Sequence, residues 1–138
     1  MNQPYLIVQD GEVLPSGSNV YKHERAALEQ LKVGNFREQA GCPGLQQALP
    51  AEASVDAFFL TDLAAVLERY GNWGYRMAQV EASIRAGWVD LGSYAQRLGA
   101  SGLTIFDDDV IEFFSPLAKG QSVMFFVALG CPQRVTVP

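Results

Sequence analysis

Between Tyr75 and Leu98 the sequence carries the longest helical pattern of the chain. Apolar residues recur there at spacings of three and four, which is the period of one face of an amphipathic helix. Gly99 follows directly and is expected to end the helix. We expect this face to lie in the core, where replacing a buried Ile or Leu by Ala costs about 2–5 kcal/mol. The face consists of Val80, Ile84, Leu91 and Leu98, on a stripe that Trp88 and Ala95 complete.

The strongest strand pattern lies at residues 122–129, where every position after Ser122 is apolar. An unbroken apolar run of this kind is typical of a central strand that is covered on both faces. Together with the long helix it predicts an α+β fold with a central mixed sheet. Further strands are expected at 5–8, 54–60 and 102–106, and a loop is expected at 14–19. Helices are expected at 23–32, after Leu60 with Thr61 or Asp62 as its cap, and at 108–114 with Asp107 as its cap. A short helical piece is expected between Pro43 and Pro50.

The composition is that of a globular protein. Of the 138 residues, 49% are apolar and 18% are charged, so a single domain over residues 1–138 can bury a core of its own. The net charge of −5, without a cluster of Lys or Arg, argues against nucleic acids and anionic membranes as partners. No apolar run is long enough for a transmembrane helix and no signal peptide is recognisable, so the expected location is the cytoplasm.

Metal chemistry finds little support in the sequence. Cys42 and Cys131 are far apart and are expected to be reduced thiols, and His23 is the one histidine, so structural zinc and haem-attachment motifs are excluded. We expect His23 to lie on the surface. The three aspartates at 107–109 are better explained by the preference of Asp for a helix N-terminus than by a cation site. We therefore expect no metal.

The segment from Arg69 to Arg76 holds the densest group of residues that are suited to chemistry. Two arginines, two tyrosines and two glycines lie between two expected helices. Arg69 is next to Tyr70, and a neighbouring cation favours the phenolate, which would make Tyr70 a better general base. Gly71 and Gly74 permit unusual backbone angles or the close approach of a planar ligand. The alternative interpretation is a helix–helix connection in which Tyr and Trp are packing anchors.

Small residues follow the long helix. Ala100, Ser101 and Gly102 leave room for backbone N–H groups to approach a ligand, although the segment is not a dinucleotide motif and is also an ordinary helix stop. Arg134 lies in a short tail after the last strand, where it either binds a phosphate or is solvated.

Several short motifs follow one another in a fixed order along the chain. They are Leu6–Val8, the loop 14–17, Tyr21, the Ala/Leu-rich stretch 26–31, Phe58–Leu60, Arg69–Gly71, Trp73–Arg76, Leu98–Gly102, Phe106–Asp108 and Ala128–Gly130. Each motif is weak alone, but the ordered set covers most of the chain. In this order the motifs resemble those in the C-terminal part of nitroreductase-family proteins, in particular the azoline dehydrogenases of the streptolysin type.

The resemblance implies a nitroreductase-like α+β fold and a homodimer that binds FMN at its interface. In the azoline branch, FMN oxidises a thiazoline or oxazoline ring while a base takes a carbon-bound proton. Tyr70 matches the tyrosine of the Lys-Tyr pair that is implicated in this step, and Arg69 replaces the lysine. Because Arg is always protonated, it can supply charge but cannot act as the base. For the flavin phosphate the chain offers Arg134 and the backbone of Ala100, Ser101 and Gly102, with Arg76 as a contributor.

The chain also departs from the family. The family's N-terminal portion, with an Arg-Arg-Ser-like segment that grips the flavin phosphate, has no counterpart here. Trp73 stands where an arginine is usual, and residues 85–90 replace the Gly-His and Gln-Asn positions of the long helix. One hypothesis is therefore an FMN-dependent oxidoreductase, or half of one, with a partner subunit that supplies the missing half and a peptide as substrate. The second is a non-catalytic scaffold or partner subunit in a peptide-modification complex, and the third is an unrelated α+β domain.

Overall fold

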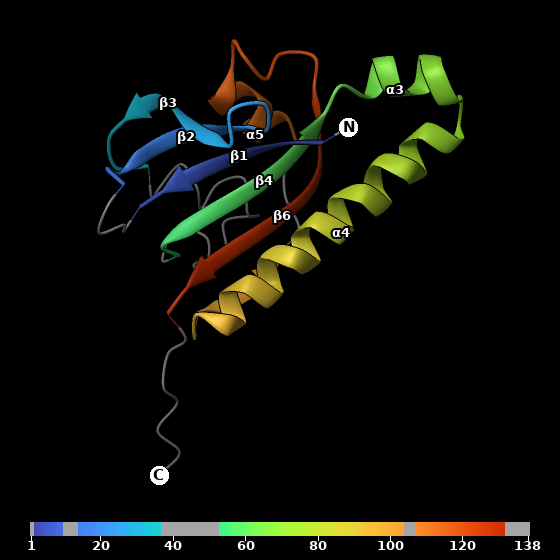
Figure 1. Ribbon diagram of the computed structural model, residues 1–138. Coiled ribbons are helices and arrows are strands. Elements are labelled where there is room, and N and C mark those ends of the chain that lie inside the picture. The colour runs from blue at the N-terminus through green and yellow to red at the C-terminus, as the bar shows by residue number, and fades with distance from the viewer. Residues whose placement is uncertain (1, 10–13, 37–52, 104–106, 132–138) are drawn as a thin grey trace.

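The computed structural model describes residues 2–9, 14–36, 53–103 and 107–131 (Figure 1). Six strands form one sheet in the order β3-β2-β1-β4-β6-β5, and every neighbouring pair is antiparallel. The expected α+β class is confirmed, whereas the expectation of a mixed sheet is wrong for these strands. The elements are β1 (Asn2–Val8), β2 (Gly17–Lys22), β3 (Ala27–Val33), β4 (Val55–Thr61), α3 (Leu63–Tyr70), α4 (Trp73–Ala95), β5 (Gly99–Gly102), α5 (Asp107–Phe114) and β6 (Ser122–Gly130).

The core lies on both faces of the sheet, because successive side chains of a strand point to opposite sides. On one face, Phe58 of β4 and Phe126 of β6 stack with ring centroids 4.4 Å apart, and Phe114 of α5 packs against them. On the other face, Phe59 and Val127 pack against α4. The expectation that strand 122–129 is covered on both faces is confirmed.

The side of α4 that faces the sheet is not the predicted one. Its buried residues are small, whereas Val80, Ile84, Trp88 and Leu91 are 58%, 57%, 75% and 68% exposed. Leu98 is half-buried and lies beyond the end of the helix. Small side chains let the helix axis approach the sheet, so this contact needs no large apolar residue. The buried positions are Gly74, Ala78, Ala82, Ala86 and Ser93.

A β-hairpin replaces the helix that was predicted at 23–32. β2 begins at Gly17, inside the expected loop, and pairs with β3 across a turn in which the N–H groups of Arg25 and Ala26 donate to the carbonyls of Lys22 and His23. The pairing shifts between Ser18 and Asn19 and leaves one extra residue in β3. Such a bulge breaks the alternation of a strand, and this is why Leu28 and Leu31, three positions apart, are both half-buried and imitate a helical pattern.

The other helix ends are partly as predicted. The Asp62 carboxylate accepts a hydrogen bond from the Ala65 N–H at 3.1 Å and caps α3, as expected. Asp107 lies inside α5, and its carboxylate accepts a hydrogen bond from the Val123 N–H at 2.8 Å. It therefore ties α5 to β6, which corrects its predicted role as a cap. The short helical piece expected between Pro43 and Pro50 lies outside the described residues.

Candidate functional site

Arg69 and Tyr70 end α3 and face a shallow hollow. The Arg69 guanidinium lies over the Tyr70 ring, 5.2 Å from its centroid, so the positive charge contacts the ring face. Tyr70 is 38% exposed. The hollow beside them encloses about 320 Å³ and is lined by Thr61, Asp62, Ala65, Val66, Arg69 and Tyr70.

The connection between α3 and α4 is shaped by its glycines. Gly71 ends α3 with a φ of 62°, a left-handed conformation that glycine adopts without strain. A Cβ at Gly74 would lie 2.8 Å from both Cγ1 and the carbonyl oxygen of Val66. The close approach at Gly74 is therefore between two helices and not toward a ligand, as in the alternative interpretation. Trp73 is nevertheless 68% exposed, with the Arg76 guanidinium 5.4 Å from its ring centroid, so it is no buried anchor.

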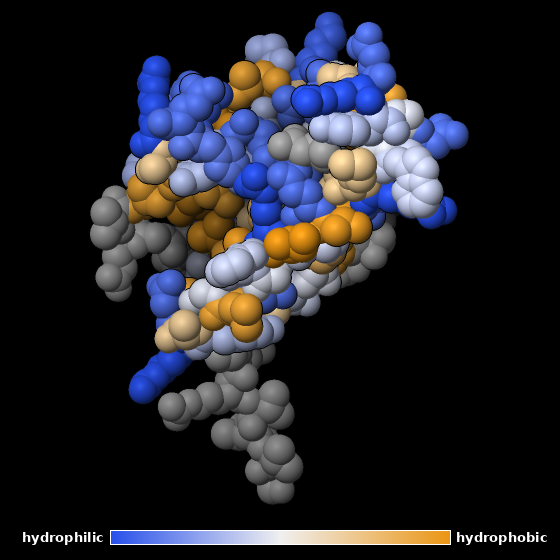
Figure 2. All heavy atoms as spheres, turned by 45° about the vertical axis from the view of Figure 1, so that its right-hand side comes forward, coloured by the Kyte–Doolittle hydropathy of each residue, from blue (hydrophilic) through white to orange (hydrophobic). Residues whose placement is uncertain are grey.

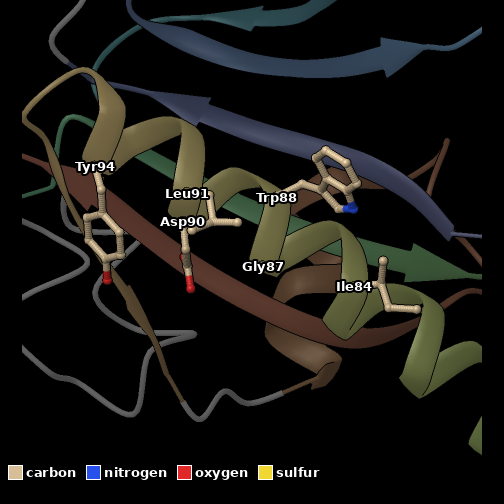
Figure 3. Close-up of a pocket in the computed structure, with 6 residues that line it drawn as sticks. All are labelled: Ile84, Gly87, Trp88, Asp90, Leu91 and Tyr94. Atoms are coloured by element: carbon tan, nitrogen blue, oxygen red, sulfur yellow. The ribbon is translucent and has the colours of Figure 1, made fainter.

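A second hollow lies on the outer side of α4 (Figure 3). It encloses about 470 Å³, and its lining is apolar and aromatic except for Asp90. The Oδ1 atom of Asp90 is buried and accepts no hydrogen bond from any described residue. A buried carboxylate oxygen in this state favours an incoming N–H or cation. The lining consists of Ile84, Gly87, Trp88, Asp90, Leu91 and Tyr94.

Ala100, Ser101 and Gly102 form an edge strand and not an open loop. They pair with Leu129, Ala128 and Val127 of β6, so part of their backbone hydrogen bonding is used within the sheet. The Tyr94 hydroxyl donates to the Ala100 carbonyl at 3.4 Å. The strand expected at 102–106 thus lies earlier, at Gly99–Gly102, and residues 104–106 lie outside the described residues. Arg134 also lies outside them.

Within one chain the described candidate site residues fall into two separate groups. Arg69 and Tyr70 end α3 just before α4 and Arg76 lies in the first turn of α4, whereas the strand Gly99–Gly102 follows the end of α4 (Figure 1). α4 has 23 residues, and at 1.5 Å per residue it is about 34 Å long. The candidate base and the candidate phosphate-binding backbone are therefore at opposite ends of this helix.

A polar cluster that was not predicted from the sequence holds α4 against β1. The Asn2 backbone N–H and side-chain amide donate to Glu81 Oε2 at 3.0 and 2.9 Å, and Arg85 donates to Glu81 Oε1. Burial raises the pKa of Glu81, but the hydrogen bonds from Asn2 and Arg85 outweigh it and hold the pKa below its usual value. His23 is exposed, as predicted, and contacts Arg85 with 2.9 Å between Nε2 and Nη1. The spacing of Glu81 and Arg85 is the one signal in the sequence for this cluster.

No group of three or more His, Cys, Asp or Glu side chains among the described residues is arranged to hold a metal ion. Nor is any described helix both long and apolar enough to cross a membrane.

The chain has a nitroreductase-like fold, as comparison with solved structures shows. A protein of Anabaena variabilis assigned to the nitroreductases matches with a TM-score of 0.90 and 27% identity, over 96% of this chain and 27% of that one. A chain of the E. coli microcin synthetase McbBCD complex, determined with truncated pro-MccB17 bound, matches with a TM-score of 0.80 and 15% identity, over 96% and 52%. An FMN-dependent nitroreductase of Clostridium difficile matches with a TM-score of 0.51 and 16% identity, over 72% and 61%.

In each of these three matches the chain spans less than two thirds of the other protein's length. No protein-family model and no curated protein matches the sequence. The comparisons therefore establish the fold and relate it to an oxidoreductase scaffold.

The described residues of one chain fit only part of an FMN molecule. The hollow on α4 offers an apolar, aromatic wall of the kind that a flavin ring would need. A phosphate needs cations or a helix N-terminus, whereas the charged residue of this hollow is the Asp90 carboxylate. The described lining therefore suits the ring and does not suit the phosphate.

Proposed function

We propose that the protein is a module of an FMN-dependent oxidoreductase whose flavin site is completed by a second subunit. The observation that carries this proposal is the fold match at a TM-score of 0.90 over 96% of the chain, combined with a hollow that suits only the flavin ring. The separation of the site residues by the length of α4 supports the need for a second subunit.

The proposed substrate is an azoline ring in a peptide. The likeness to a chain of a microcin synthetase complex supports this substrate class, as does the ordered set of motifs around Tyr70. In the proposed reaction the Tyr70 oxygen takes the carbon-bound proton, and the Arg69 guanidinium over its ring supplies positive charge. The bound FMN would supply the oxidising power by accepting the ring's hydride. The exposure of Tyr70 leaves its hydroxyl within reach of a peptide.

A non-catalytic scaffold is the second candidate function, and one observation favours it. The hollow on α4 presents a carboxylate and no cation among its described lining residues. In this case the module would belong to a peptide-modification complex in which other subunits carry the flavin.

Titration of FMN against the purified chain, followed by fluorescence quenching, tests whether the chain alone holds the cofactor. A charge-assisted hydrogen bond is worth roughly 1.5–3 kcal/mol, so the loss of two phosphate contacts weakens binding by roughly two to four powers of ten. We expect weak, exchangeable binding, with riboflavin bound about as well as FMN because the phosphate is not held. Stoichiometric nanomolar binding by the chain alone would contradict the proposal of an incomplete site.

Assay of azoline oxidation with candidate partner subunits tests the catalytic part. We expect activity only in the reconstituted complex, and Tyr70→Phe in that complex should lower kcat by about 10²–10⁴-fold if Tyr70 is the base. Tyr21→Phe is the matched control, because it removes a tyrosine hydroxyl on β2 that lines neither hollow. Full activity of the Tyr70→Phe complex would exclude Tyr70 as the base, and a colourless, inactive complex would favour the scaffold.

A further inference from the structure

The hollow beside Tyr70 is a groove that follows one side of α3. We call it the α3 groove, and it is lined by Thr61, Asp62, Ala65, Val66, Arg69 and Tyr70. From Asp62 onward, these positions recur at the spacing of a single helix side. Thr61 is buried and Val66 is half-buried, whereas Asp62, Arg69 and Tyr70 are exposed. The first two therefore form the floor of the groove, and the other three are accessible to a ligand.

The length of the α3 groove matches a short extended peptide. Asp62 caps the start of α3 and Tyr70 is its last residue, so this helix of eight residues separates them by about 12 Å at 1.5 Å per residue. An extended chain rises about 3.3 Å per residue, so a peptide that follows the groove passes from one to the other in roughly three to four residues.

The two ends of the α3 groove carry opposite charges. At one end the Arg69 guanidinium lies over the Tyr70 ring, 5.2 Å from its centroid. At the other end is the carboxylate of Asp62, whose Oδ1 accepts a hydrogen bond from the Ala65 N–H at 3.1 Å. A carboxylate can accept about four hydrogen bonds, and no cation pairs with Asp62 in the part of the chain that the structure describes. Asp62 therefore keeps the capacity to accept hydrogen bonds from a positively charged group.

The surroundings of the α3 groove also suit a polar, basic ligand. Figure 2 brings this side of the molecule forward and shows hydrophilic residues at the top, near α3, and hydrophobic residues lower down along α4. The net charge of −5 adds attraction for a cationic peptide over longer distances.

We propose that the α3 groove selects a basic residue of the peptide substrate. The azoline ring lies at the Tyr70 end, and a Lys or Arg side chain about three or four residues away pairs with Asp62. This role of Asp62 deepens the proposed function and rests on it for the place of the ring. Asp62 contacts the peptide away from the reacting atoms, so it determines specificity and takes no part in the proton transfer. Because both partners of such an ion pair are exposed, its effect on affinity is modest.

Titration of the chain by nuclear magnetic resonance tests this selection without flavin. The probes are synthetic peptides that carry one thiazoline ring and one Lys, placed about three or four positions from the ring on either side. The same peptides with norleucine in place of Lys keep the length of the side chain and remove its charge. We expect the Lys peptide of one side to bind about three- to tenfold tighter than its norleucine counterpart, with amide shifts along α3.

Two variants attribute the selection to Asp62. Asp62→Asn should abolish the preference for Lys and keep the helix cap, because Asn caps helices about as well as Asp. Glu68→Gln is the matched control: Glu68 is exposed on α3 but does not line the groove, so the preference should remain. Equal affinity of Lys and norleucine peptides, no binding of either, or a preference that survives Asp62→Asn would each overturn the proposal, provided that circular dichroism shows the variants folded.

The oxidation assay in the reconstituted complex keeps the selection distinct from the chemistry. Asp62→Asn should act on KM and raise it about three- to tenfold for Lys peptides, whereas Tyr70→Phe should act on kcat. A chain that selects Lys peptides through Asp62 but oxidises no azoline in any complex would contradict the proposed function and leave the selection standing. Oxidation that requires Tyr70 but shows no preference for Lys would do the reverse.

Discussion

Gly17 shows how a single residue sets the pairing of the β2–β3 hairpin. A Cβ built there would lie 2.2 Å from the Lys32 carbonyl oxygen, and this atom belongs to the neighbouring strand backbone. We expect Gly17→Ala to lower the free energy of unfolding by roughly 1–3 kcal/mol, the usual cost of overpacking. Gly92→Ala is the control: it has open space around it in a helix and should gain about 0.5–1 kcal/mol. Urea denaturation measures both, and equal effects would refute the assigned contact.

Glu81 is expected to link stability to pH. Its pKa is below the usual value because the hydrogen bonds from Asn2 and Arg85 outweigh burial. A group with a lowered native pKa stabilises the fold at pH values above its unfolded pKa, and this contribution is lost as the pH falls through the native pKa. Denaturation at pH 7 and at pH values of about 3 should therefore show wild type more stable than Glu81→Gln at neutral pH, with a smaller difference in acid. A difference that grows on acidification would reverse the sign of the inferred shift.

At the scale of elements, α4 has a side of small residues that faces the sheet and a side of large residues that faces outward. Ala82 is fully buried against the sheet, so Ala82→Leu should cost roughly 1–3 kcal/mol through overpacking. Ile84→Ala, on the exposed side of α4, should cost the monomer much less than the roughly 2–5 kcal/mol of a buried site. Chemical denaturation at dilutions where the protein is monomeric compares them. A larger cost at Ile84 would mean that its side chain is buried in the monomer.

The sequence predicted that most elements exist, but it predicted less well where they begin and end and which side of a helix faces the core. The strands at 55–61 and 122–130 and the helix capped by Asp62 were predictable because an apolar run and a cap residue act locally. The orientation of α4 was not, because an apolar stripe marks a face without telling whether it packs within the chain or against another molecule. The hairpin at 17–33 was missed because a bulge gave a strand the spacing of a helix. The candidate site could be predicted only as a set of segments, since their separation depends on the direction of α4.

At the scale of the whole molecule, the exposed apolar side of α4 couples stability to association. If a second copy covers this side of α4, binding stabilises the folded state by mass action, and the melting temperature rises with protein concentration. We expect calorimetric scans over a hundredfold range of concentration to show this rise for wild type and no rise for Leu91→Asp, which places a charge on the exposed side of α4. A wild-type melting temperature that is independent of concentration would show that self-association does not stabilise the folded chain.

The order of strands in the sheet also has a consequence for synthesis of the chain. β4 lies between β1 and β6, and its pairing with β6 joins Val55–Thr61 to residues 122–129, with α3, α4, β5 and α5 made in between. While the nascent chain emerges, α4 is therefore made before β6, the last strand of the sheet against which it packs, and both sides of the helix are uncovered until then. Pairing across such a long interval is slow and leaves apolar surface open during elongation. The protein's yield in a cell then depends on how quickly the last strand arrives, and a pause between residues 95 and 122 should increase the share that aggregates or is captured by chaperones.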